Sequence, residues 1–199
     1  MEEIVIATKN SGKIREFYSL LYPIFSRIIS LGELGCSVEI VEDGSNFSEN
    51  ALKKARIVAE LTKKPTIADD SGLEVFALNG RPGIFSARYA GENAEDRENI
   101  EKLLRELKGI TDRRARFVCS LALVFPDGEE VVAEGVCEGT IVDKPRGNGG
   151  FGYDPVFLLP EVDKTMAELS LEEKNLFSHR ARALRALIMY LNGRKKARL

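Results

Sequence analysis

The stretch Ile67-Ala68-Asp69-Asp70-Ser71-Gly72 indicates both the fold and the chemistry of this chain. A short apolar run, from Thr66 to Ala68, leads into two adjacent carboxylates and then into a Ser-Gly pair that is typical of a turn. A buried strand that delivers acidic groups to the edge of a binding site produces this order. A hard cation such as Mg²⁺ is usually held by one or two carboxylates together with substrate phosphates. A polar turn that merely ends a strand is the alternative interpretation.

The two carboxylates cannot both face one site while the strand continues. Successive side chains of a β-strand point to opposite faces of the sheet. If Asp70 faces the site, Asp69 therefore turns away from it, unless the turn has already begun at these residues.

Strands and helices intermix along the rest of the chain. The run 115–125 is apolar on both faces, which predicts a central strand covered on both sides. Pro126-Asp127-Gly128 predicts a turn into the next strand, so that a hairpin lies mid-chain. These patterns favour an α/β fold with a mixed central sheet flanked by helices, in a single domain over residues 1–199. The other expected strands are 4–7, the run ending at 69–70, 73–78, 131–136 and 155–159.

Helix positions follow from apolar spacing and from capping residues. Asn46, with Glu49 three residues later, predicts the start of the second helix. Thr165 with Glu168 and Ser170 with Glu173 are capping boxes that open two short helices. The other expected helices contain the apolar positions of 14–21 and 100–107, and those of 184–191, the last ending at Gly193.

Composition excludes several classes of protein. With 29 basic and 31 acidic residues, the net charge of −2 gives no electrostatic reason to expect nucleic-acid or membrane partners. No apolar run approaches the ~20 residues that span a membrane. Met-Glu-Glu leads directly into an expected strand, so we expect no signal peptide. Cys36, Cys119 and Cys137 form no Cys-x-x-Cys pair, which predicts free thiols in a reducing compartment. We therefore expect a cytoplasmic protein.

The segment Thr8–Lys13 links a strand to a helix. Backbone N–H groups at a helix start attract anions, and Lys13 adds a positive charge there. The segment is not a P-loop, because Ala7 and Ile14 stand where that motif needs Gly and Ser or Thr. An ordinary capped helix start is the alternative.

The run Gly147–Gly152 formally contains a dinucleotide-binding pattern. It opens a strand-like segment at 155–157 rather than a helix, which excludes that interpretation. Its glycines instead allow close approach of the backbone to a ligand, while Phe151 and Tyr153 offer faces for a base and Asp154 offers a polar contact. A glycine-rich hairpin with two core aromatics is the alternative.

The single histidine, His179, lies between Ser178 and Arg180 at the expected start of the last helix. These residues, with Lys174 one turn upstream, either recognise a ligand or form a solvent-facing cap. Arg88 either reaches a phosphate or is solvated.

Five segments together carry a resemblance to a known family. In this order the chain resembles the inosine/xanthosine triphosphate pyrophosphatases, which hydrolyse deaminated purine nucleotides. The resemblance spans residues 8 to 180, and each segment is weak alone. The segments are Thr8-x-Asn10-x-Gly12-Lys13, Ile67–Leu73, Pro82–Arg88, Gly150–Pro155 and Ser178-His179-Arg180.

The resemblance implies a role for each matching residue. Asp70 is the essential carboxylate, which holds Mg²⁺ and serves as, or orients, the general base. Glu42 is the second metal ligand, with Glu39 as the alternative. Ser71 and Lys54 contact the substrate, and the triphosphate binds to Thr8, Lys9, Asn10, Ser11, Gly12 and Lys13.

The resemblance also implies a nucleoside site and an assembly. Phe151 stacks on the purine, and His179 and Arg180 read the base. The family is typically a homodimer of elongated, two-lobed subunits with the cleft between the lobes. The remaining nucleoside-binding residues are Gly152, Tyr153, Asp154 and Lys174.

The implied reaction is Mg²⁺-dependent hydrolysis of ITP, dITP and XTP between the α- and β-phosphates. A pyrophosphatase of similar fold that acts on other modified nucleotides is one rival. A nucleotide-binding module without catalytic activity is a rival from a different class.

Overall fold

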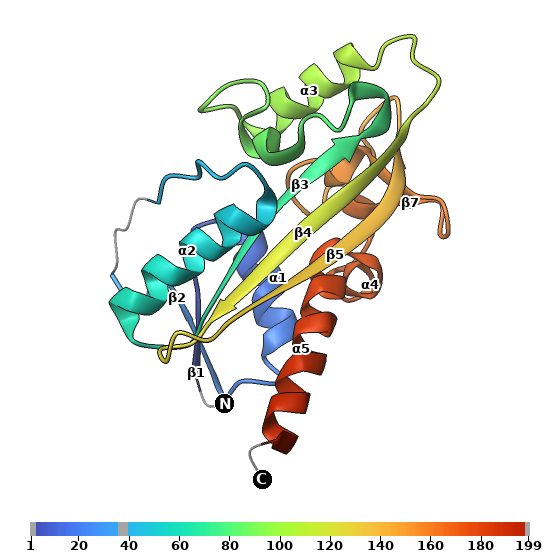
Figure 1. The fold of residues 1–199 in the computed structure, drawn as a ribbon. Coiled ribbons are helices and arrows are strands. Elements are labelled where there is room, and N and C mark those ends of the chain that lie inside the picture. Colours follow the sequence, from blue (N-terminus) through green and yellow to red (C-terminus); the bar gives the residue numbers. More distant parts are fainter. Residues whose placement is uncertain (1–2, 36–39, 198–199) are drawn as a thin grey trace. The chain divides into compact units, whose positions relative to one another are not determined.

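The computed structural model describes residues 3–35 and 40–197, and among them seven strands form one sheet in the order β2-β1-β3-β4-β5-β6-β7 (Figure 1). β1 pairs in parallel with both β2 and β3, whereas β6 is antiparallel to β5 and β7, so the sheet is mixed, as predicted. The strands are β1 (Glu3–Ile6), β2 (Arg27–Ser30), β3 (Thr66–Val75), β4 (Arg114–Val124), β5 (Glu130–Ile141), β6 (Phe157–Leu159) and β7 (Lys164–Thr165).

The helices confirm the α/β class. Each predicted helix is present, except that the one expected after Thr165 is a 3₁₀ turn. The helices are α1 (Ser11–Leu21), α2 (Phe47–Thr62), α3 (Asp96–Glu106), α4 (Leu171–Phe177) and α5 (His179–Ala197), with 3₁₀ turns at Phe76–Leu78, Gly83–Arg88, Asp154–Val156 and Met166–Glu168.

The chain divides into two compact units, and the division passes through β3, β4 and β5. The first unit comprises residues 1–70, 119–135 and 180–199. The second comprises residues 71–118 and 136–179.

The strands of the first unit are buried on both faces, which explains their nearly continuous apolar sequence. Ile4, Ile6 and Ile67 pack in one cluster with apolar residues of α1 and α5, helices that lie beside each other in Figure 1. Val5 and Ala68 belong to a second cluster, which contains the apolar residues of α2. The alternation along β3 therefore sends Asp69 toward the α1 and α5 side and Asp70 toward the α2 side.

Side-chain caps fix where the first two helices begin. The Asn10 side chain accepts the Lys13 N–H (2.9 Å) at the start of α1, and the Asn46 side chain accepts the Glu49 N–H (2.9 Å) at the start of α2. The Glu49 carboxylate accepts the Ser45 N–H (2.8 Å), one residue before the position that a capping box would use.

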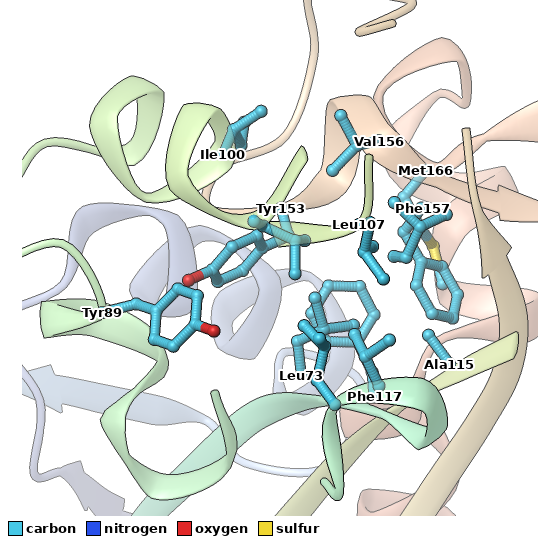
Figure 2. Close-up of a cluster of buried hydrophobic side chains, with 14 of the residues drawn as sticks. Leu73, Tyr89, Ile100, Leu107, Ala115, Phe117, Tyr153, Val156, Phe157 and Met166 are labelled. Carbon is cyan, nitrogen blue, oxygen red and sulfur yellow. The ribbon is translucent and has the colours of Figure 1, made fainter. Parts of the chain in front are cut away.

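The second unit has a core of its own. Figure 2 shows Leu73, Phe117 and Phe157 in a cluster with Tyr153 and Met166. The rings of Phe117 and Phe157 lie 4.5 Å apart between centroids. This core surrounds the base of the glycine-rich loop, because Tyr153 follows that loop directly.

The predicted turn at Ser71-Gly72 is wrong, and so is a separate strand at 73–78. β3 continues to Val75, and the chain turns only at the 3₁₀ segment Phe76–Leu78. The Ser86 hydroxyl accepts the Leu73 N–H (2.8 Å), a tertiary contact that stabilises the extended backbone past the Ser-Gly signal. The polar-turn alternative for the two aspartates is therefore wrong as well.

Other boundaries differ from the pattern. β5 extends beyond residue 136, and α5 continues past Gly193. The strand β2 was not predicted, because a segment of four residues is too short to show a periodic pattern. Cys119 and Cys137 are buried free thiols, as predicted, whereas Cys36 and Glu39 lie outside the described residues. None of the helices in the described part of the chain has the length and apolar character needed to cross a membrane.

Candidate active site

The loop that joins β1 to α1 holds the predicted phosphate-binding residues. Ala7 donates its N–H to the Ile67 carbonyl (2.8 Å), which fixes the start of the loop beside β3. Residues 9–11 are exposed, while Thr8 and Gly12 are half-buried. At the end of the loop, the Lys13 ammonium lies 3.1 Å from Asp69 Oδ1. An ion pair therefore connects the start of α1 with Asp69 of β3.

Asp69 is fully buried between two cations. Besides Lys13, the Arg180 guanidinium binds Asp69 Oδ2 through Nε (3.2 Å) and Nη2 (2.8 Å). Burial alone would raise the pKa of Asp69, but the charges of Lys13, Arg180 and Lys54 outweigh it and hold that pKa well below its usual range. Asp69 is therefore permanently ionised, and it organises cations rather than accepting a proton.

Arg180 completes a buried chain of charges. Its side chain is 1% exposed, and its Nη1 also binds the Glu16 carboxylate of α1. Burial would lower the pKa of Arg180, but Asp69 and Glu16 raise it further above its ordinary value. Lys13, Asp69, Arg180 and Glu16 thus alternate in charge and link α1, β3 and α5.

Asp70 meets a different environment on the α2 side. Its Oδ2 accepts a hydrogen bond from the Asn50 amide (3.0 Å), and its Oδ1 lies 3.3 Å from the Lys54 ammonium. The same ammonium lies 2.7 Å from Glu42 Oε1. Glu42 and Asp70 thus converge on one cation, although they come from a loop and a strand.

The two adjacent aspartates have opposite pKa shifts. Burial raises the pKa of Asp70 above its ordinary value, and Glu42 contributes in the same direction, while Lys54, Lys13 and Asn50 oppose the shift. A pair of carboxylates whose environments separate their pKa values is a common feature of acid–base sites. Of the two carboxylates, Asp70 is the one better suited to accept a proton.

Glu42 and Asp70 are the two predicted metal ligands, and the structure brings both within reach of one ammonium group. Two carboxylates suit a magnesium ion that takes its other ligands from phosphates and water. Within the described residues, no three or more His, Cys, Asp or Glu side chains gather as a metal site. A cation at this place would therefore depend on the substrate for part of its coordination.

The second unit holds the predicted nucleoside-binding residues. The Asp154 carboxylate accepts the Phe151 N–H (2.9 Å) and binds the Lys174 ammonium, and both charged groups are buried. That ammonium also lies 4.9 Å from the centroid of the half-buried Phe151 ring. Gly152 donates its N–H to the Asp96 carboxylate (2.6 Å). These contacts fix the conformation of the loop around the Phe151 ring.

Two predicted site residues lie in the core of this unit. The Tyr153 hydroxyl donates to the Ser86 carbonyl (2.9 Å) and its ring packs inside the cluster of Figure 2, so this ring offers no face to a base. The alternative of a core aromatic is therefore right for Tyr153. His179 is buried and stacks on Phe117 (4.7 Å between ring centroids), so the solvent-facing cap alternative is wrong.

A sequence model of the Ham1 family matches residues 4–190.

The chain belongs to the Ham1 family.

A curated relative from Halalkalibacterium halodurans, named dITP/XTP pyrophosphatase, is 53% identical over 194 residues, which are 96% of this chain and 100% of that protein. A dITP/XTP pyrophosphatase from Geobacillus kaustophilus is 55% identical over 189 residues, which are 94% of this chain and 93% of that protein. The solved structure of the Staphylococcus aureus Ham1 protein matches with a TM-score of 0.86 at 51% identity, covering 97% of this chain and 100% of that one.

The predicted residues of this Ham1 chain fall into two groups. The first unit brings together Lys13, Glu42, Lys54 and Asp70, and the Thr8–Gly12 segment leads into Lys13. It also contains Arg180, which is held by Asp69 and Glu16. The second unit brings together Phe151, Asp154 and Lys174. It also contains Gly152, the buried Tyr153 and His179, and the half-buried Ser71.

Sequence reasoning missed two polar residues of the candidate site. Asn50 lies one helical turn before Lys54, and Glu16 lies three residues after Lys13, so each shares a helix face with a predicted residue. Both are buried. Each is a polar residue next to a buried apolar neighbour, and that is the signal that could have identified them.

Proposed function

We propose that this chain hydrolyses dITP, ITP and XTP to the nucleoside monophosphate and pyrophosphate. The observation that carries the proposal is identity above 50% to curated dITP/XTP pyrophosphatases over almost the full length of both chains. The buried carboxylate Asp70, with its raised pKa, supports a hydrolytic role over simple nucleotide binding.

In the proposed mechanism, the Thr8–Lys13 segment binds the β- and γ-phosphates as one leaving group. The α1 N-terminus and the Lys13 ammonium stabilise negative charge that develops there. Asp70 accepts a proton from the attacking water, and Lys54 contacts the substrate beside it. Mg²⁺ held by Asp70 and Glu42 would neutralise phosphate charge when bound. Asp69 positions Lys13 through their ion pair.

The nucleoside site that we propose is centred on Phe151, whose ring stacks on the purine. Lys174 donates to the 6-oxo group of hypoxanthine or xanthine, where adenine carries an amino group. Asp154 and Gly152 support the loop, as their hydrogen bonds to Phe151 and Asp96 indicate. His179 remains a predicted contact to the base. The resemblance gives Arg180 the same role, but its buried ion pairs with Asp69 and Glu16 favour a structural one. A cleft between two lobes also remains a prediction.

We also propose that the chain acts in the cytoplasm as a homodimer. The buried free thiols of Cys119 and Cys137 are compatible with a reducing compartment. The homodimer rests on the family resemblance alone. A monomeric mass in light scattering, with full activity, would refute it.

The first test is a nucleotide panel with product analysis. We expect ITP, dITP and XTP to give the monophosphate and pyrophosphate, with no orthophosphate until an inorganic pyrophosphatase is added. A chelator should stop the reaction and Mg²⁺ should restore it. Release of orthophosphate with a diphosphate product would refute the cleavage position, and binding without turnover would favour a nucleotide-binding module. Preference for other modified nucleotides would favour the rival pyrophosphatase.

Lys174→Met should narrow the preference for ITP over ATP in kcat/KM. A donor that loses its hydrogen bond to the base when ATP replaces ITP can give discrimination of ~10⁴ or more, and the variant should lose most of it. Lys164→Met is the matched control, because Lys164 makes an exposed ion pair with Glu173 in the same unit. An equal loss for both nucleotides would instead assign Lys174 to folding of the Phe151 loop through Asp154.

A further inference from the structure

Asn50 is a buried amide at the first turn of α2 with two specific partners. The residue is almost fully enclosed, at 1% exposure. Its Nδ2 donates to Asp70 Oδ2 (3.0 Å), and its Oδ1 accepts the Gly44 N–H (2.8 Å). Gly44 lies two residues after Glu42, in the segment that precedes α2. One side chain therefore connects the strand that carries Asp70 with the segment that carries Glu42.

The chemistry of these partners requires an amide. A carboxylate only accepts hydrogen bonds and a backbone N–H only donates them, so the residue between them must both donate and accept. Aspartate at this position would present an acceptor to Asp70, and leucine would leave both partners unsatisfied. Asn50 is also neutral, and so it holds Asp70 without a charge that competes with a metal ion for the carboxylates.

Gly44 is fitted to this contact. A Cβ placed on Gly44 would lie 2.6 Å from Asn50 Oδ1 and 2.9 Å from Glu49 Cβ, closer than real Cβ contacts. Crowding rather than a left-handed backbone therefore explains the glycine. The segment approaches α2 closely because nothing larger than hydrogen occupies that space.

We propose that Asn50 is a positioning residue that sets the separation of Glu42 and Asp70 through its bonds to Gly44 and Asp70. The inference rests on the proposed function for the role of the two carboxylates. The geometry of the link stands on the contacts themselves. Groups that orient metal-binding carboxylates commonly change metal affinity or activity by ~10–100-fold when they are removed.

The test disrupts the link from each of two residues, Asn50 and Gly44. Asn50→Leu removes both hydrogen bonds, and Gly44→Ala pushes the Asn50 amide from its place. For each variant, a titration with Mn²⁺ alone, followed by electron paramagnetic resonance, measures metal affinity, and kcat and KM for ITP are measured at saturating Mg²⁺. We expect each variant to weaken Mn²⁺ binding and to lower kcat by ~10-fold or more, with KM for ITP within about threefold.

The double variant is the sharpest measurement. If both changes break the same link, their combined effect should equal that of the stronger single change, because additivity fails for groups that share a contact. Effects that multiply would show independent causes and overturn the proposal. Unchanged Mn²⁺ affinity and kcat in either folded single variant would overturn it too, and Gly44→Ala suffices if Asn50→Leu does not fold.

Three controls separate positioning from stability. Lys53→Met removes an exposed contact between the same helix and the same segment, the 2.5 Å ion pair with Asp43. Asn99→Leu removes a buried amide that bonds the Ala90 N–H and the Ala87 carbonyl in the second unit, whereas Glu42 and Asp70 belong to the first. Gly32→Ala adds a Cβ that would lie 3.8 Å from Ser30 Oγ, an ordinary contact distance. Metal affinity should be unchanged in all three, although Asn99→Leu should unfold at lower temperature. A wild-type protein that binds Mn²⁺ but releases no pyrophosphate would refute the proposed function. It would leave the proposed role of Asn50 in metal binding intact.

Discussion

Asp70→Asn is expected to abolish turnover while leaving the fold intact. The loss in kcat should reach ~10³-fold or more, because one substitution removes the group that we propose both as the proton acceptor and as a metal ligand. The raised pKa of Asp70 means that, at neutral pH, its ionised form lowers the free energy of unfolding. A neutral amide of the same shape should therefore keep or increase stability. Pyrophosphate release and thermal unfolding measure the two effects.

The matched control is Asp69→Asn, the same change one residue earlier. The pKa of Asp69 is lowered, so its charge contributes stability at neutral pH, which is lost only as the pH falls through that low value. We expect this variant to unfold at a lower temperature and to retain more activity than Asp70→Asn. If the Asp70 variant retained activity and the Asp69 variant lost it, Asp69 rather than Asp70 would be the essential carboxylate.

Local signals were sufficient for most of the fold. Asn10 and Asn46 begin helices because their side chains satisfy free N–H groups at a helix start, and that chemistry is readable in sequence. The prediction of a turn at Ser71-Gly72 was wrong because tertiary contacts outweighed the local preference of these two residues for a turn. Leu73 donates to Ser86, thirteen residues later in the chain, and no periodicity predicts such a bond.

The parts of the candidate site that lie in short sequence motifs were predictable. The ion pairs between residues far apart in the sequence were not. Alternation along β3 correctly separated Asp69 from Asp70. It could not show that Asp69 binds Arg180, 111 residues away, because an ion pair between distant segments leaves no local pattern. For the same reason the opposite pKa shifts of the two aspartates were invisible, since they depend on which cations surround each group.

Arg180 shows how this limit affects a functional assignment. The resemblance implies that this arginine reads the base. In the structure its guanidinium is buried and binds Asp69 through Nε and Nη2 and Glu16 through Nη1. A buried arginine between two carboxylates satisfies charges that would otherwise be very unfavourable in the core. The contacts therefore favour a structural role that supports Lys13 through Asp69.

Arg180→Met should consequently destabilise the protein by about 3–5 kcal/mol, because it leaves Asp69 and Glu16 as buried charges without their shared partner. Chemical denaturation measures the loss. Adding Glu16→Gln to that variant should restore part of it, since one orphaned charge is removed, whereas two independent sites would give additive losses. The ITP-to-ATP ratio of kcat/KM, measured well below the unfolding temperature, separates the two roles. Wild-type stability together with a narrowed ratio would show that Arg180 reads the base and that the buried pairs contribute little.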